Sequence, residues 1–221
     1  MKKVMCSILP ILAIALLVAM VSGAAFAQLP GPGAGEDTAE YFTTNYFANN
    51  TTSGAPDATL RYTEHYGGLL ASGQKLCANI YVFDAQQEPL ECCGCLITPN
   101  GLVTTSVKTQ LTANSLTGGP IPDGVVQIVS SMPVGGVCDP TFGASAAPGG
   151  TTIALGAAPF PEVDSWMTHI QNKVGTAFPI TEGEGVEELL TAGEFADLAI
   201  DCAFVREFGT GQGVCTCGTE K

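Results

Sequence analysis

Cysteine is the residue type that offers the most chemistry in this 221-residue chain. Three of the nine cysteines lie within Glu91–Cys95, which reads E-C-C-G-C, and a C-x-C pair lies close to the C-terminus. Clustered thiolates of this kind are ligands for zinc or copper(I). In an exported chain, however, thiols oxidise before they meet a metal, and the C-x-C pair lacks the C-x-x-C redox pattern. We therefore expect disulfides at Cys77, Cys92, Cys93, Cys95, Cys138, Cys202, Cys215 and Cys217.

Catalysis by a Ser-His or Cys-His pair would have to use His65 or His169, the two histidines of the chain. Ser145 lies in a G-A-S-A-A stretch that half-resembles a nucleophile elbow, but the second glycine is missing. Carboxylates gather near the C-terminal third without the D-x-D-x-D-G pattern of a calcium loop, which favours a solvated loop. These carboxylates are Glu182, Glu184, Glu187 and Glu188. We predict no enzyme activity, no catalytic residue, no cofactor and no metal.

The first 27 residues have the three-part layout of a cleaved signal peptide. Lys2 and Lys3 precede an apolar run from Ile8 to Val21, and an A-x-A pattern ends just before Gln28. The alternative is an uncleaved membrane anchor, but the run of about 14 residues is shorter than the roughly 20 needed to span a bilayer. Cleavage would also remove Cys6. The sequence therefore predicts a secreted protein, either extracellular or periplasmic.

Loss of Lys2 and Lys3 leaves six of eight basic residues against 21 acidic ones, a net charge of −15. Nucleic acids and anionic lipids bind proteins through Lys and Arg, so a nucleic-acid partner is excluded. No further apolar run is long enough to span a membrane. The remaining partners are an unknown extracellular ligand or a second copy of the chain.

Residues 28–58 are rich in Pro, Gly, Asn and Thr, and we expect them to form a flexible leader. Two aromatic pairs within them, Tyr41–Phe42 and Tyr46–Phe47, would either dock on the main body or belong to an irregular first strand. Asn49 and Asn50 each begin an N-x-T sequon. A single disulfide-rich domain is expected over residues 59–221.

Short β-type segments separated by Gly, Pro and Asn turns follow the leader. Leu60, Tyr62 and Tyr66 alternate with polar residues, as in a half-buried strand. Residues 76–84 are apolar on both faces and suit a central strand. An Asn-Gly turn at residues 100–101 lies between two more β-type runs, 96–98 and 102–107, and predicts a hairpin. The last runs cover residues 125–129 and 151–155.

Two helices are expected in the last third. Val163, Met167 and Ile170 lie at helical spacing, which indicates a short helix. A longer helix should begin with a Thr-Ala-Gly-Glu capping box at Thr191 and end at Gly209, in a left-handed C-cap. Its apolar stripe consists of Phe195, Leu198, Ala199, Cys202, Val205 and Phe208. The predicted fold is mainly β: a disulfide-stapled β-sandwich or open barrel, with one or two C-terminal helices packed on it.

Three segments together resemble a group of secreted bacterial proteins of uncharacterised function. They are Leu76–Asp84, the E-C-C-G-C cluster with the T-P-N-G-L that follows at residues 98–102, and the stretch from Cys202 to Cys215. The resemblance covers roughly residues 76–217. This chain has Leu96 where the group usually has proline, and C-x-C where its final pair is often C-x-x-C. The resemblance implies secretion and a disulfide framework, and no activity.

The expected helix also suggests how the cysteines pair. The glycine-rich stretch from Gly209 to Gly213 gives the chain a return path from the helix to the sheet. We therefore expect Cys215 and Cys217 to bond to the cluster at residues 92–95. Cys77 would take a cluster cysteine on a neighbouring strand, which leaves Cys138 to pair with Cys202 beneath the helix.

Two functional hypotheses follow. The first is a secreted, non-catalytic binding or cell-surface module whose loops contact an unknown ligand. The alternative is a structural or fibre subunit in which leader residues 36–58 donate a strand to the sheet edge of a neighbour.

Overall fold

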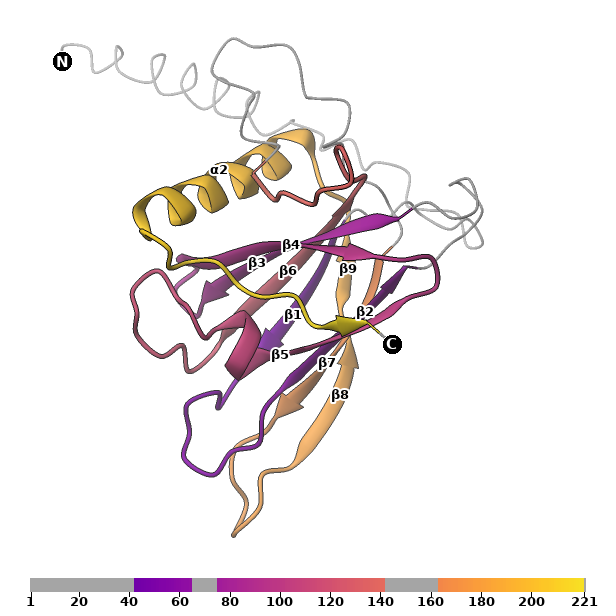
Figure 1. Ribbon diagram of the computed structural model, residues 1–221. Helices are drawn as coiled ribbons and strands as arrows, with labels where there is room; N and C mark the ends of the chain where they lie inside the picture. The colour runs from indigo at the N-terminus through magenta and orange to yellow at the C-terminus, as the bar shows by residue number, and fades with distance from the viewer. Residues whose placement is uncertain (1–41, 65–74, 142–162, 221) are drawn as a thin grey trace, which may run out of the picture. The chain divides into compact units, whose positions relative to one another are not determined.

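The computed structural model describes residues 42–64, 75–141 and 163–220, all within one compact unit, Ala39–Lys221 (Figure 1). Its strands form two antiparallel five-stranded sheets, which confirms the predicted mainly β class. Sheet A has the order β4 (Pro89–Ile97), β3 (Leu76–Asp84), β6 (Gly124–Ser131), β1 (Phe42–Phe47) and β9 (Val186–Glu188). Sheet B has the order β10 (Thr219–Glu220), β5 (Leu102–Ser106), β2 (Thr59–Glu64), β7 (Val163–Ile170) and β8 (Ile180–Glu184).

Within the residues described, two helices accompany the sheets: the short π-helix η1 (Val107–Leu111) and α2 (Ala192–Phe208). The main core lies between the sheets, where alternate residues such as Ile80 of β3, Leu60 of β2 and Met167 of β7 are fully buried. A second apolar cluster lies on the opposite, outer face of sheet A, where Tyr81 and Val129 pack against Phe195 of α2. Figure 1 shows α2 lying along this outer face, which therefore buries apolar side chains on both sides of sheet A.

Strand β3 has the bounds that the sequence predicted, Leu76–Asp84, and it is central in sheet A because it pairs with β4 and β6. It is buried on both faces because the core between the sheets covers one face and α2 packs against the other. The predicted strand at 125–129 lies within β6, and Leu60 and Tyr62 alternate inward on β2. The predicted strand at 151–155, Tyr66 and the signal peptide lie outside the described residues.

The short helix predicted around Met167 is wrong, because these residues form β7. Ser165, Met167 and His169 are buried, whereas Trp166 and Thr168 between them are only half-buried. Val163 and Met167 are four residues apart, a spacing that fits a strand as well as a helix. Pairing with β2 on one side and β8 on the other makes the segment a strand.

The Asn-Gly turn does not form the predicted hairpin. Asn100 adopts a left-handed φ of 58°, and Gly101 N–H donates to Thr98 O at 2.8 Å, so the turn itself is present. The turn, however, carries the chain from β4 in sheet A to β5 in sheet B. The hairpin partner of β4 is β3, through a turn in which the Asp84 carboxylate accepts from the N–H groups of Gln86 and Glu88.

The prediction of a flexible leader is wrong for residues 42–58, whereas the alternative of a first strand is confirmed for Phe42 and for Tyr46–Phe47. Phe42–Phe47 form β1, which lies between β6 and β9 inside sheet A. Both sequon asparagines are part of the folded structure: Asn49 Nδ2 donates to Ile170 O, and Asn50 Nδ2 donates to Ile121 O, each at 2.9 Å. The domain therefore begins before the predicted boundary at residue 59, while residues 28–41 lie outside the described part.

Helix α2 begins with the predicted capping box. Thr191 Oγ1 accepts from Glu194 N–H at 3.2 Å, and the Glu194 carboxylate accepts from Thr191 N–H at 2.8 Å. The C-terminal end of the helix differs from the predicted left-handed C-cap, because Gly209 has a right-handed φ of −69°. Glycine is required there by space, since a Cβ would lie 2.3 Å from Gln212 O. Phe208, predicted to face the core, is 63% exposed.

Candidate functional site

Four disulfides use all eight predicted cysteines. They are Cys77–Cys138, Cys92–Cys202, Cys93–Cys215 and Cys95–Cys217. The predicted bonds from Cys215 and Cys217 to the cluster are confirmed. The other two pairings were wrong: Cys77 bonds to Cys138, and Cys202 bonds to a cluster cysteine.

The register of sheet A explains this error. Cys215 and Cys217 take Cys93 and Cys95, so Cys92 is the cluster cysteine that remains. It lies opposite Tyr81, four residues along β3 from Cys77, which is about 13 Å at the rise of a strand. Disulfide-bonded cysteines have Cα atoms less than about 7 Å apart, so this pair is out of reach. Cys138 instead crosses over β4 at Gly94, where an added Cβ would lie 2.4 Å from Cys138 O. The glycine of the E-C-C-G-C motif therefore makes room for the bond to Cys77.

A metal site was the alternative interpretation of the cysteine cluster. The sulfur atoms of Cys93, Cys95 and Cys217 do lie within 4.8 Å of one another. Each of them is bonded to another sulfur, and a disulfide has no thiolate to offer a metal. The cluster is therefore a structural feature of this fold.

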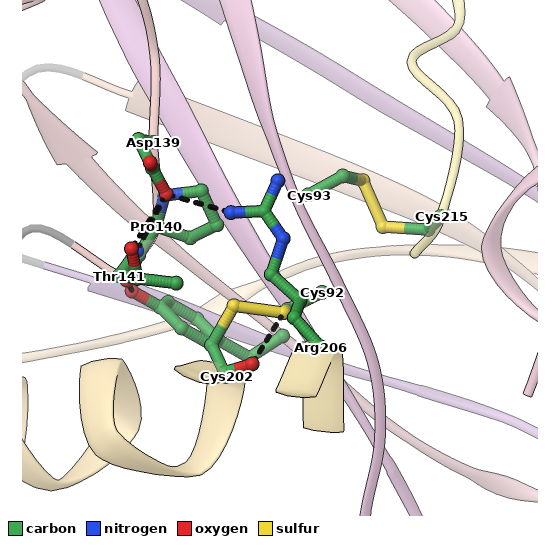
Figure 2. Close-up of a disulfide and its surroundings, with 9 residues drawn as sticks. Cys92, Cys93, Asp139, Pro140, Thr141, Cys202, Arg206 and Cys215 are labelled. Atoms are coloured by element: carbon green, nitrogen blue, oxygen red, sulfur yellow. Dashed lines mark hydrogen bonds and ion pairs between the residues drawn. A yellow bond between two sulfur atoms is a disulfide. The ribbon is translucent and has the colours of Figure 1, made fainter. Parts of the chain in front are cut away.

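The disulfide Cys92–Cys202 fixes α2 to sheet A, and two polar contacts hold the adjoining loop (Figure 2). Arg206 of α2 forms an ion pair with Asp139 at 2.7 Å, and Tyr81 Oη donates to Pro140 O at 3.0 Å. Burial raises the pKa of the Asp139 carboxyl, but hydrogen bonds from Thr141 and the Arg206 charge outweigh it and lower the pKa. The helix is therefore held in place by covalent and charged contacts near its C-terminal half.

The N-terminal half of α2 borders a groove of about 520 Å³ on the outer face of sheet A. The apolar part of the lining comes from both the sheet and the helix: Phe42, Phe83, Val125, Leu190 and Leu198. The first four of these side chains are only half-buried, so part of their apolar surface is left exposed. Thr44 and Gln127 lie between them on adjacent strands. A concave, mainly apolar site of this size is typical of sites for small ligands.

Four carboxylates also line the groove: Asp84, Glu194, Asp197 and Asp201. Asp84 and Glu194 are held by the β3–β4 turn and the capping box, and the Thr191 hydroxyl and N–H lower the pKa of Glu194. Asp197 and Asp201 lie one helical turn apart. Burial, followed by the Asp197 charge, raises the pKa of Asp201. The groove therefore holds several negative charges in close proximity.

No basic side chain is among the residues that line this groove. Three basic residues are engaged elsewhere: Arg61 pairs with Glu182, Lys108 donates to Ala55 O at 2.7 Å, and Arg206 pairs with Asp139. The charge of the groove is therefore not balanced by the residues that line it.

Two further candidates from the sequence, His169 and Glu182, make structural contacts. His169 is 7% exposed, its ring stacks on Tyr46 with centroids 4.0 Å apart, and Nδ1 lies 2.9 Å from Tyr46 O. The expected solvated loop of glutamates is instead part of β8 and β9, where Glu182 pairs with Arg61. His65 and Ser145 lie outside the described residues.

Comparison with protein-family models, curated proteins and solved structures finds no match to this chain. In the part of the chain that the structure describes, no helix has the length and apolar character to cross a membrane. The groove was not predicted from the sequence. The one available signal was the pair Asp197 and Asp201, spaced four residues apart on a helix whose other side is apolar.

Proposed function

We propose that this protein is an exported, non-catalytic binding module that holds its ligand in the groove between α2 and sheet A. The observation that carries the proposal is the concave apolar surface of about 520 Å³, which the disulfide-anchored helix leaves open. Phe42, Phe83 and Leu190 offer apolar contact area, and Thr44 and Gln127 offer hydrogen-bonding groups between them. This combination of apolar contact area with polar groups suits an organic ligand.

The way the groove is built supports binding as its role. The Cys92–Cys202 bond fixes one wall against the sheet, so little conformational freedom is lost when a ligand enters. Four disulfides also favour an oxidising compartment, which agrees with the signal peptide predicted for residues 1–27. Export places the groove where it meets extracellular or periplasmic molecules.

The proposal is tested with N-phenyl-1-naphthylamine, a neutral dye that fluoresces in apolar sites. We expect saturable fluorescence with the disulfide-bonded protein and loss of this signal in Thr44→Trp, because the indole fills the groove from β1. Thr181→Trp, on the exposed strand β8, is the matched control and should bind the dye like the wild type. Equal dye binding by Thr44→Trp and the wild type would refute the groove as the binding site.

The fibre-subunit alternative gains no support from the strands described. Phe42–Phe47, part of the segment that this alternative would donate to a neighbour, are paired over six residues with β6 of their own chain. The edge strand β8 carries Glu182 and Glu184, and charged side chains on an edge disfavour pairing with another sheet.

A further inference from the structure

We propose that the groove selects small ligands that join a protonated amine to an apolar chain or ring. This inference rests on the function proposed above and names the chemical class of its ligand. It follows from two properties of the same groove: an apolar floor provided mainly by the sheet, and a carboxylate-bearing wall provided by α2.

The floor determines the apolar part of the ligand. Phe83 of β3 and Val125 of β6 are directly opposite each other in the register, and Phe42 extends the same face on β1. The register places Thr44 and Gln127 between Phe42 and the Phe83–Val125 pair, so the half-exposed apolar side chains form two patches on the floor. Covering these patches with an alkyl chain or ring stabilises the complex by about 25 cal/mol for each Å² removed from water.

The helical wall determines the charge of the ligand. Asp197 and Asp201 are one turn apart on α2, so both carboxylates border the same side of the groove. Asp84 and Glu194 add two further negative charges, and the lining holds no positive one. An anionic ligand would be repelled by all four carboxylates, whereas an ammonium group would relieve the repulsion between Asp197 and Asp201.

The position of the charges favours a ligand in which the amine lies at one end. The carboxylates of Asp197 and Asp201 come from the helix, while Phe83 and Val125 come from the sheet below it. The amine would therefore contact the wall as the apolar part lies on the floor. A compact polycation without an apolar part would leave the floor uncovered and gain only screened surface attraction.

The test compares three probes that share an eight-carbon chain: octylammonium, 1-octanol and octanoate. Titration calorimetry at neutral pH uses the disulfide-bonded protein from Gln28 to Lys221. We expect octylammonium to bind roughly tenfold more tightly than 1-octanol, and octanoate to bind most weakly of the three. Octylammonium binding should weaken as salt is raised, because ionic strength screens partly exposed charges.

Variants then assign the charge effect to the helix. Asp197→Asn/Asp201→Asn should weaken octylammonium binding roughly tenfold and bring its affinity close to that of 1-octanol. The matched control Glu184→Gln/Glu207→Gln also removes two exposed negative charges, but neither residue lines the groove. It should leave octylammonium affinity unchanged within about twofold.

Three results would overturn the inference: no binding of octylammonium, equal binding of all three probes, or unchanged octylammonium affinity in the Asp197→Asn/Asp201→Asn variant. In each case the naphthylamine experiment separates the two proposals. If Thr44→Trp still abolishes dye binding, the groove is a ligand site without selection for amines. If Thr44→Trp binds the dye normally, the proposed binding function fails as well.

Discussion

Glu91 is a buried carboxyl group whose replacement by glutamine should change how the stability of the protein depends on pH. The residue lies in β4 and is 2% exposed. Its Oε1 accepts from Asn114 N–H at 3.0 Å, while Oε2 has no hydrogen-bond partner among the described residues. Burial raises the pKa of Glu91 from 4.5 to about 8, although the hydrogen bond from Asn114 acts to lower it.

The sign of the effect follows from the protons bound in each state. Between pH 4.5 and about pH 8, Glu91 is protonated in the folded protein and ionised in the unfolded chain. The folded state then binds one more proton, so the free energy of unfolding falls as the pH rises through this window. The difference between the two pKa values corresponds to a free energy of at most about 5 kcal/mol. We expect about 3 kcal/mol, because the effective dielectric constant at a buried site in a protein is higher than that of a dry apolar medium.

Glu91→Gln keeps the shape of the side chain and removes the titration. We expect the variant and the wild type to have similar stability at pH 5, and the variant to be more stable by about 3 kcal/mol at pH 8.5. Urea denaturation of the disulfide-bonded proteins, measured from pH 4.5 to pH 9, gives both curves. Glu88→Gln, at an exposed position in the turn that precedes β4, is the control and should follow the wild type. Parallel curves for Glu91→Gln and the wild type would refute the reasoning.

Three further predictions concern the disulfides and the helix. Cys92→Ser/Cys202→Ser should lower the free energy of unfolding by about 3 kcal/mol, because Cys93–Cys215 already joins the neighbouring residue to the C-terminal segment and Cys92–Cys202 then closes a ring of about 15 residues. At a temperature where this variant and Cys77→Ser/Cys138→Ser are both folded, naphthylamine binding should weaken in the first and persist in the second. Equal binding by the two variants would contradict the anchoring role of Cys92–Cys202. Gly94→Ala should lower the free energy of unfolding by about 2–4 kcal/mol in urea denaturation, because its Cβ would collide with Cys138 O. Gly193→Ala, whose Cβ would meet nothing closer than 3.9 Å, should be neutral or stabilising. An unchanged denaturation midpoint for Gly94→Ala would contradict the close approach of Cys138. Arg206→Met should lower the melting temperature only slightly, since the half-exposed ion pair with Asp139 contributes about 1 kcal/mol or less to stability. A loss of several kcal/mol in the free energy of unfolding would show instead that the ion pair orders the loop.

The sequence by itself determined the features that depend on neighbouring residues. The capping box of α2 needs only Thr191 and Glu194, three residues apart, and it forms as predicted. Leu76–Asp84 is apolar on both faces, so it was identified as a central strand with its observed bounds. The return of the C-terminal cysteines to the cluster was also predicted, since a glycine-rich stretch after α2 leaves the chain free to turn back.

Features that depend on distant partners were decided only by the tertiary structure. The turn at Asn100 forms as the sequence suggests, yet it joins two sheets because β4 pairs with β3 and β5 pairs with β2. Met167 lies in a strand because β2 and β8 flank it, although its spacing from Val163 also fits a helix. Cys77 could be assigned to Cys138 only once the register of β3 and β4 was known.

The groove belongs to this second group. Its floor comes from β1, β3 and β6 and its wall from α2, elements that are separated by up to about 150 residues in the sequence. A periodic pattern records which side of one element is apolar, but it does not record which other element covers that side or how completely. The part of sheet A that α2 leaves uncovered is fixed by where the Cys92–Cys202 bond holds the helix, and this placement exists only in the folded protein.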